Sequence, residues 1–286
     1  MNIKVMPATP ILGAEVAGVD LSKPLDDATF RAINDAFVKH SVICIRDQNL
    51  TPEQLVSFSK RFGPLVVHVL KEALLEGHPE IYRLSNKKVD GKAQGRPNAG
   101  QYWHSDLTYE PVPSLGSVMY GLEVPDYGGD TLFASTAHAF DTLSKPMQEF
   151  LEGLTAEHLF AHAFRGGTNP AARAGDPLHE RPAVEHPVVR VHPESGRKCI
   201  FVNDGFTVRI KGVTPAESTA LMAFLNAHMT RAEVVYRHHW RTGDVIIWDN
   251  RALVHRGVGD YDETKTRHMY RTTIADQAAQ AAQAAE

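Results

Sequence analysis

Short apolar runs, rich in β-branched and aromatic residues, recur along the second half of the chain. Turn residues separate these runs, including Tyr127-Gly-Gly-Asp130 and Pro193-Glu-Ser-Gly196. Short runs bounded by Gly, Pro, Asn and Asp are typical of β-strands. The pattern predicts strands, in chain order, at GSVMYGLEV, DTLFAS, PVVRVH, KCIFVN, TVRIKG, VVYRHHW, DVIIWDN, ALVHRG and HMYRTTI.

Three segments have the apolar spacing of helices. Residues 26–40 end in basic residues, which suit a helix C-terminus, and residues 215–229 are amphipathic. Residues 51–61 begin with Thr-Pro-Glu-Gln, a typical helix start. Directly after the helical segment at 26–40, the run SVICIRD at 41–47 predicts a buried strand. Many short strands with few helices favour a mainly β fold, a sandwich or barrel with helical insertions.

Neither an internal repeat nor a long linker divides the sequence, so we expect one domain over residues 1–276. Residues 84–102 are rich in Gly, Lys, Asn and Gln and predict a loop, the type of segment that often forms a lid or binding loop. Residues 277–286 (QAAQAAQAAE) form a low-complexity tail that we expect to be frayed or helical.

Composition adds limits on partners and location. With 43% hydrophobic residues and a net charge of -4, the chain is ordinary for a globular protein and offers no electrostatic case for nucleic acid or an anionic membrane. Both cysteines, Cys44 and Cys199, sit in apolar runs, which suits a reducing compartment. We find no signal-peptide pattern and no apolar stretch of about 18 residues that would span a bilayer. We therefore expect a cytoplasmic protein.

The first chemical motif is Trp-His104-Ser-Asp106. Side chains two positions apart share one face of an extended strand, so His104 and Asp106 would supply two ligands to a metal. A second histidine from elsewhere would complete a facial triad, which suits non-haem iron(II) and leaves open positions. The motif alone is weak. His78-Pro-Glu80 and His192-Pro-Glu194 have the same spacing, and we interpret both as turns.

A second segment strengthens the interpretation. An apolar strand from Asp244 leads through a turn to a short strand that carries His255, and Arg267 and Arg271 follow. Arginine binds carboxylates through a bidentate fork, so one of the two would hold the distal carboxylate of 2-oxoglutarate. Because the arginines are four positions apart, both would point the same way from a strand.

These motifs together resemble the taurine dioxygenase and 2,4-dichlorophenoxyacetate dioxygenase family. The resemblance rests on WHSD at 103–106, GGDT at 128–131, WDNRALVHRG at 248–257 and the R-x-x-x-R of 267–271. GAEVAGVDL at 13–21, RFGPL at 61–65 and the segment 186–210 agree with it, so it covers roughly residues 10 to 275. It implies a double-stranded β-helix (jelly roll) and an Fe(II)- and 2-oxoglutarate-dependent dioxygenase that uses O2.

The resemblance also implies roles for single residues. His104, Asp106 and His255 match the iron ligands, whereas Arg267 and Thr131 match the residues that bind the C5 carboxylate of 2-oxoglutarate. The implied substrate contacts are His68, Phe206 and Arg271, the last for an anionic group. Read alone, Phe206 also fits a core aromatic, His68 a satisfied core histidine and Arg271 a member of a structural ion pair. The family further implies a homo-oligomer, a dimer or tetramer.

The sequence departs from the taurine enzyme at Gly100, where that enzyme offers an asparagine to its substrate, and by one residue inserted between His255 and Arg267. Both changes argue against taurine. We expect instead a small sulfonate, alkyl sulfate or aryloxyalkanoate, hydroxylated with release of succinate and CO2 so that a C–S or C–O bond then breaks. Asp106 argues against a halogenase, which needs its coordination position for a halide.

Two other classes of protein fit the triad alone. A zinc hydrolase uses the same ligand types with a bound water, and a jelly-roll binding module needs no catalysis. The arginines after His255 favour the dioxygenase, because neither alternative needs a carboxylate clamp there. His158 and His162, four apart, lack the Glu of a zinc-protease motif, so we expect packing or surface roles for them.

Overall fold

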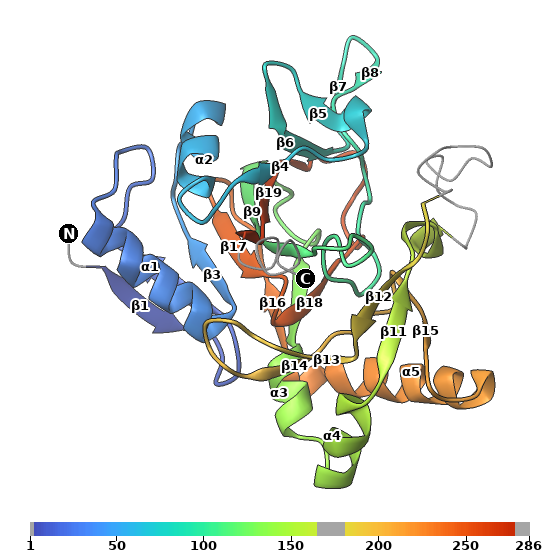
Figure 1. The fold of residues 1–286 in the computed structure, drawn as a ribbon. Helices are drawn as coiled ribbons and strands as arrows, with labels where there is room; N and C mark the ends of the chain where they lie inside the picture. Colours follow the sequence, from blue (N-terminus) through green and yellow to red (C-terminus); the bar gives the residue numbers. More distant parts are fainter. Residues whose placement is uncertain (1–2, 165–180, 278–286) are drawn as a thin grey trace.

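A computed structural model describes residues 3–164 and 181–277 and contains one dominant sheet (Figure 1). Its strands follow the order β1-β2-β3-β17-β9-β19-β6-β5, and β4 pairs with β19 outside this path. Neighbours are antiparallel except β2 and β3, which are parallel. The bounds are β1 Lys4–Pro7, β2 Ala14–Ala17, β3 Val42–Ile45, β4 Leu65–Val66, β5 Leu74–Leu75, β6 His78–Ser85, β9 Ser114–Glu123, β17 Val245–Asp249 and β19 His268–Ala275.

Smaller sheets and helices surround the large sheet. A three-stranded sheet, β16-β10-β18, provides the second wall of the site, and a sheet β12-β11-β15 and two hairpins lie further out. The strands are β7 Lys88–Val89, β8 Lys92–Ala93, β10 Thr131–Ser135, β11 Thr155–His158, β12 Val184–Pro187, β13 Val189–Val191, β14 Lys198–Ile200, β15 Thr207–Ile210, β16 Val235–His238 and β18 Leu253–Gly257. The helices are α1 Asp27–His40, α2 Pro52–Ser59, α3 Thr136–Asp141, α4 Lys145–Glu152 and α5 Pro215–Met229, with short 3-10 turns at Lys71–Ala73, Phe160–Phe164 and Ala232–Val234.

Strands β3, β9 and β17 are buried on both faces, and their alternate residues enter two different cores. On β17, Val245 and Ile247 face a core that α1 and α2 cover, whereas Ile246 and Trp248 face the opposite core. This period of two is the geometry of an extended chain, and it explains why the strand is a continuous apolar run. Each large side chain buried in this way contributes about 1.5–3 kcal/mol to folding.

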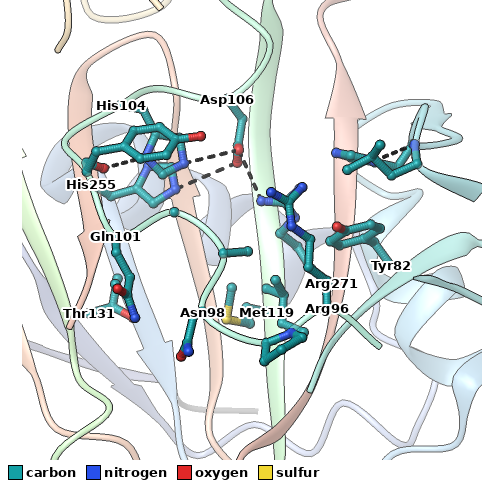
Figure 2. Close-up of a pocket in the computed structure, with 18 of the residues that line it drawn as sticks. Tyr82, Arg96, Asn98, Gln101, His104, Asp106, Met119, Thr131, His255 and Arg271 are labelled. Atoms are coloured by element: carbon teal, nitrogen blue, oxygen red, sulfur yellow. Dashed lines mark hydrogen bonds and ion pairs between the residues drawn. The ribbon is translucent and has the colours of Figure 1, made fainter. Parts of the chain in front are cut away.

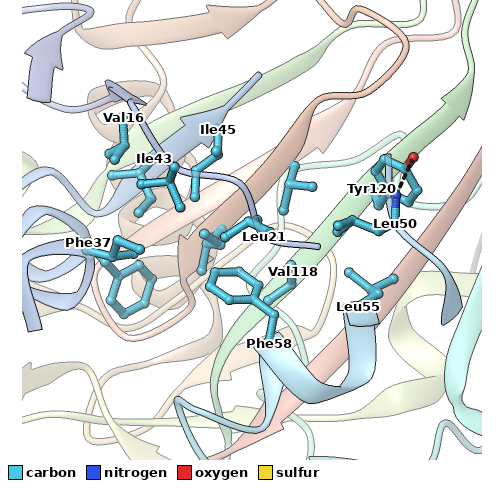
Figure 3. Packing of buried hydrophobic residues seen from close by; sticks show 14 of the residues in the cluster. Val16, Leu21, Phe37, Ile43, Ile45, Leu50, Leu55, Phe58, Val118 and Tyr120 are labelled. Atoms are coloured by element: carbon cyan, nitrogen blue, oxygen red, sulfur yellow. Dashed lines mark hydrogen bonds between the residues drawn. The ribbon is translucent and has the colours of Figure 1, made fainter. Parts of the chain in front are cut away.

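Helices α1 and α2 begin where the sequence predicts. Asp26 caps α1 by accepting from Thr29 N–H, and Thr51 forms a capping box with Gln54 at the start of α2. Their apolar faces contribute Phe37 and Phe58, among others, to the core in Figure 3. This face of the large sheet is therefore sealed by helices, and the site must lie on the other face.

The opposite face of the large sheet packs against β16-β10-β18. Phe133 of β10 and Leu253 of β18 lie in one cluster with Ile246 and Trp248 of β17 and Met269 of β19. Two sheets face to face with an open end form the expected double-stranded β-helix. A separate core under α3, α4 and α5 includes Phe140, Leu151 and Leu225 and supports the outer sheet.

The structure confirms the helix at 215–229, and the predicted strands at 41–47, 244–250 and 252–257 correspond to β3, β17 and β18. The prediction of a turn at His78-Pro-Glu80 is wrong, because these residues begin β6; Pro79 is tolerated near the end of that strand. Of the predicted loop at 84–102, residues 84 and 85 end strand β6, and the rest forms a loop apart from the small β7–β8 hairpin. Of the tail, residues 278–286 lie outside the described residues. No helix in the described ranges is long and apolar enough to cross a membrane.

Candidate metal centre and substrate cavity

His104 and His255 are joined through their backbones. The two residues form an isolated antiparallel bridge, in which His104 N–H donates to the His255 carbonyl at 3.0 Å and His255 N–H donates back at 2.7 Å. The bridge brings the ring centroids to 4.2 Å of each other. His255 lies in β18, whereas the residues on either side of His104 belong to no strand. Main-chain hydrogen bonds therefore set the positions of both imidazoles.

Asp106 completes the group at the point where the chain turns away from the bridge. One carboxylate oxygen lies 3.8 Å from Nε2 of His104, and the other lies 3.9 Å from Nε2 of His255. One ligand atom from each residue lies within 4.8 Å of the others, and all three residues are buried. The expected extended strand is wrong here, because Asp106 lies in a turn in which Leu107 has φ 59°. The predicted convergence is nevertheless present.

The carboxylate of Asp106 is held on both oxygens. Ser117 Oγ donates to Oδ2 at 2.8 Å, and Arg271 donates from a terminal guanidinium nitrogen to Oδ1 at 3.1 Å. Burial raises the pKa of Asp106, but Arg271, the two imidazoles and Ser117 outweigh that effect and hold the pKa well below its usual range. Asp106 is therefore an anion at any physiological pH.

Both histidines are suited to metal binding. Burial lowers the pKa of His104 and that of His255, so both rings are neutral and retain a lone pair. Nδ1 of His104 lies 2.8 Å from the Tyr102 carbonyl, which assigns the proton to Nδ1 and leaves the lone pair on Nε2, toward Asp106. Two neutral imidazoles with one carboxylate form the donor set of non-haem iron(II).

The turn between β17 and β18 is fixed by a buried network. Arg251 and His192 both donate to the carboxylate of Asp249, with the His192 ring at 2.9 Å. Next to it, the Asn250 side chain accepts from Trp248 Nε1 at 3.0 Å. These contacts fix the start of β18, and through it His255.

Arg267 and Thr131 line the same cavity as the three residues of the metal group. Arg267 Nε donates to the Gly129 carbonyl at 3.0 Å, and Gly129 has φ 66°, where a side chain would meet Arg267 at 3.1 Å. The Thr131 hydroxyl accepts from Trp240 Nε1 at 3.0 Å. Figure 2 shows Thr131 on the left of the cavity and Arg271 on the right, with the His-Asp-His group above them.

His68, Phe206 and Arg271 line the cavity as well. Burial, aided by Arg271, lowers the pKa of His68 to about 3, so its ring is neutral. Its Nδ1 accepts from Leu70 N–H at 3.1 Å, which leaves Nε2 as the ring donor. Phe206 packs against the ring of Tyr109 at 4.8 Å. All eight predicted site residues thus lie around one cavity.

The sequence does not predict several residues that line the cavity or hold its side chains in place. Arg96 and Tyr102 lie in or beside the loop at 84–102, whose composition predicts only a loop. Ser117 and Trp240 lie on or near strands, where a serine or tryptophan in an apolar pattern gives no signal of a polar contact. Their roles depend on which residues the fold brings opposite them.

A second group with metal-ligand atoms, Cys44, His238 and Asp244, has a different character. The Asp244 carboxylate already accepts from Arg46 at 2.8 Å and from His238 at 3.0 Å. Burial raises the pKa of Cys44, so its thiol stays protonated. We interpret this group as a buried structural network. His239, the residue after β16, is by contrast exposed.

Comparison with known proteins agrees with this site. The family model described as "Taurine catabolism dioxygenase TauD, TfdA family" matches residues 4–273. The alpha-ketoglutarate-dependent 2,4-dichlorophenoxyacetate dioxygenase of Cupriavidus pinatubonensis is 34% identical, over 97% of this chain and 99% of that protein. The alpha-ketoglutarate-dependent sulfate ester dioxygenase of Pseudomonas putida is 36% identical, over 96% and 90%.

Among solved structures, AAD-2 in complex with Mn(II) and N-oxalylglycine has a TM-score of 0.82 at 29% identity, covering 97% of this chain and 98% of that one. The fold, the cavity and the near full-length match agree with one another. The chain belongs to the TauD, TfdA family of dioxygenases.

Proposed function

We propose that this protein is an Fe(II)- and 2-oxoglutarate-dependent dioxygenase that hydroxylates a small organic acid, a sulfonate, an alkyl sulfate or an aryloxyalkanoate. The observation that carries the proposal is the joint presence, in one cavity, of the His104-Asp106-His255 group and Arg267. A zinc hydrolase would also need the His-Asp-His group, but it would have no role for Arg267.

His104, Asp106 and His255 would hold the iron. When bound, iron(II) with 2-oxoglutarate and O2 supplies the oxidising chemistry that converts a C–H bond to C–OH, with succinate and CO2 as the other products. The protein contributes a preset ligand group, because the backbone bridge fixes the two imidazoles while Ser117 and Arg271 orient the carboxylate.

Arg267 and Thr131 would bind the distal carboxylate of 2-oxoglutarate. Gly129 accepts from Nε of Arg267, and this contact orients the guanidinium so that its terminal nitrogens can form a fork with a carboxylate. Trp240 donates to the Thr131 oxygen, so the Thr131 hydroxyl proton is free to be donated to the ligand.

The substrate would lie at the other end of the cavity. Arg271 provides a cation for the anionic head, neutral His68 provides an N–H donor, and Phe206 provides an apolar wall beside Tyr109. If the hydroxylated carbon bears the sulfur or oxygen substituent, the product breaks at that C–S or C–O bond. Relatives named for 2,4-dichlorophenoxyacetate and sulfate esters support this range of substrates.

We further propose a single catalytic domain over residues 1–276, a cytoplasmic location and assembly into a homodimer or homotetramer. The match of the family model over residues 4–273 supports the domain assignment. Size-exclusion chromatography with light scattering would test the assembly.

The test of function is an anaerobic titration of the metal-free protein with iron(II) and 2-oxoglutarate. The dioxygenase should develop a weak visible charge-transfer band, whereas His255→Ala should not. Oxygen uptake and succinate formation are then measured with a panel of sulfonates, alkyl sulfates and aryloxyalkanoates. Absence of the band in a folded wild-type protein would refute the iron assignment, and a band without substrate-coupled succinate would refute the substrate range.

A further inference from the structure

Arg96 is held at the edge of the cavity by its backbone. Its N–H donates to the Arg83 carbonyl at 3.0 Å, and its carbonyl accepts from Ser85 N–H at 3.1 Å, on either side of Leu84 in β6. This is a parallel bridge between the loop and the strand. The position of Arg96 is therefore defined by the sheet, although most of its neighbours in sequence belong to a loop.

The guanidinium of Arg96 lies on the same side of the cavity as that of Arg271 (Figure 2). Arg271 sits 5.3 Å from the centroid of the Tyr82 ring. Burial raises the pKa of Tyr82, and the charges of Arg96 and Arg271 both oppose that shift, so both lie close to this ring. The same two charges act on His68, whose neutral ring cannot repel a cation.

Neither guanidinium is fully used by the protein. Arg271 gives one terminal nitrogen to Asp106, and its Nε is buried without a hydrogen-bond partner among the described residues. Arg96 forms no ion pair with a carboxylate in the described ranges; its guanidinium carbon lies 5.5 Å from the Phe164 ring centroid. Two like charges near one ring repel each other, and an anion between them offsets that repulsion. The arrangement thus fits an anion that both arginines share.

We propose that Arg96 is a specificity-determining residue, which with Arg271 forms a two-arginine site for a tetrahedral sulfur oxyanion, a sulfonate or sulfate ester, in preference to a carboxylate. The inference rests on the proposed function and narrows its substrate range. It assigns to Arg96 a contact with the substrate head group, whereas the metal and 2-oxoglutarate contacts involve other residues.

The preference follows from the shape of the head group. A planar carboxylate has two oxygens, and a single guanidinium fork satisfies both of them in one plane. A sulfonate or sulfate ester has three terminal oxygens arranged around sulfur, so a fork from Arg271 leaves one oxygen directed elsewhere. A second guanidinium from a different element can reach that oxygen. Arg96 should therefore contribute much more to sulfur oxyanions than to carboxylates.

The test compares ligands with the same alkyl body, hexanesulfonate, hexyl sulfate and heptanoate. Their dissociation constants are measured by calorimetry on the anaerobic enzyme loaded with iron(II) and 2-oxoglutarate, so no turnover occurs. Arg96→Gln should weaken binding of both sulfur oxyanions by roughly ten- to a hundredfold, the worth of a charged hydrogen bond, and that of heptanoate by less than about threefold. Arg96→Lys keeps the charge but lacks the fork, so its dissociation constants for the sulfur oxyanions should lie between those of the wild type and those of Arg96→Gln.

Lys92→Gln is the matched control, because Lys92 is an exposed residue of β8, four positions before Arg96, and does not line the cavity. It removes the same charge and should leave all three constants unchanged. Equal losses for heptanoate and hexyl sulfate in Arg96→Gln, no loss for either, or failure of the wild type to bind a sulfur oxyanion would each overturn the inference. The charge-transfer band, measured on the same samples, reports separately whether the proposed function holds.

Discussion

Ser117 offers the sharpest test of how the carboxylate of the metal group is oriented. Its hydroxyl donates to Asp106 Oδ2 at 2.8 Å from a fully buried position on β9. A hydrogen bond to a buried charge contributes about 1.5–3 kcal/mol, and about 1.4 kcal/mol changes an equilibrium constant tenfold. Ser117→Ala should therefore weaken metal binding by roughly tenfold to a hundredfold, in line with other contacts behind metal ligands.

Ser114 provides a matched control in the same network. Its hydroxyl donates to the backbone carbonyl of Asp106 at 3.0 Å, and the Asn250 side chain donates to both serines. Ser114→Ala removes a buried hydroxyl of the same kind without touching the carboxylate. Ser114→Ala should lose about 1 kcal/mol of folding free energy and Ser117→Ala about 1.5–3 kcal/mol, but Ser114→Ala should change metal affinity by less than about threefold.

The assay is calorimetric titration of each metal-free variant with iron(II) under anaerobic conditions, with guanidinium unfolding to measure stability. If both variants lose stability and only Ser117→Ala loses metal affinity, the hydroxyl of Ser117 orients the carboxylate. Equal losses of affinity would refute this reasoning, because they would show that general loosening of the network is responsible.

Three further predictions concern the rest of the cavity and the core. Arg267→Lys should raise the KM for 2-oxoglutarate about tenfold or more, because a lysine cannot both donate to Gly129 and form a fork; an unchanged KM contradicts this role. Trp240→Phe should weaken 2-oxoglutarate binding severalfold by freeing the Thr131 hydroxyl to rotate, with iron affinity unchanged in the absence of 2-oxoglutarate, both measured by anaerobic titration. His158 is buried, and burial lowers its pKa from 6.5 to about 3. Between these two pH values the unfolded chain binds a proton at His158 and the folded chain does not. The free energy of unfolding therefore falls as the pH drops from 6.5 toward 3. His158→Gln should make that decline shallower by about 1.4 kcal/mol per pH unit, measured by urea unfolding at three pH values; an identical slope argues against the buried neutral ring.

Much of the site was predictable because its residues are spaced by regular structure. The apolar run before Asp249 defines β17, and the short run that follows defines the strand carrying His255, so the position of that histidine could be inferred. Arg267 and Arg271 line one cavity because they are four apart along an extended segment. In these cases the local pattern and the tertiary structure agree.

Other features depend on contacts between distant segments, and local patterns do not report them. The turn at Asp106 follows from a left-handed residue, Leu107, a type of residue that rarely adopts this conformation. The start of β6 escapes prediction because Pro79 suggests a turn, although the apolar residues after it continue into the sheet. The bridge between His104 and His255 joins positions far apart in the chain. No pattern within either segment indicates which partner it will meet.

The loop before the metal group is tied to the barrel at two points, Arg96 on β6 and Gly100, whose carbonyl accepts from Gly257 N–H at 2.8 Å. Both ties are main-chain bonds, so they do not depend on which side chains the loop carries. Pro97 and Ala99, which line the cavity between the ties, can therefore be exchanged without dislodging the loop or the iron ligands, whereas Asn98 has φ 53°, a left-handed conformation that favours Asn, Asp or Gly. An engineer can therefore vary two positions of the cavity wall to change substrate preference while leaving the metal group as it is.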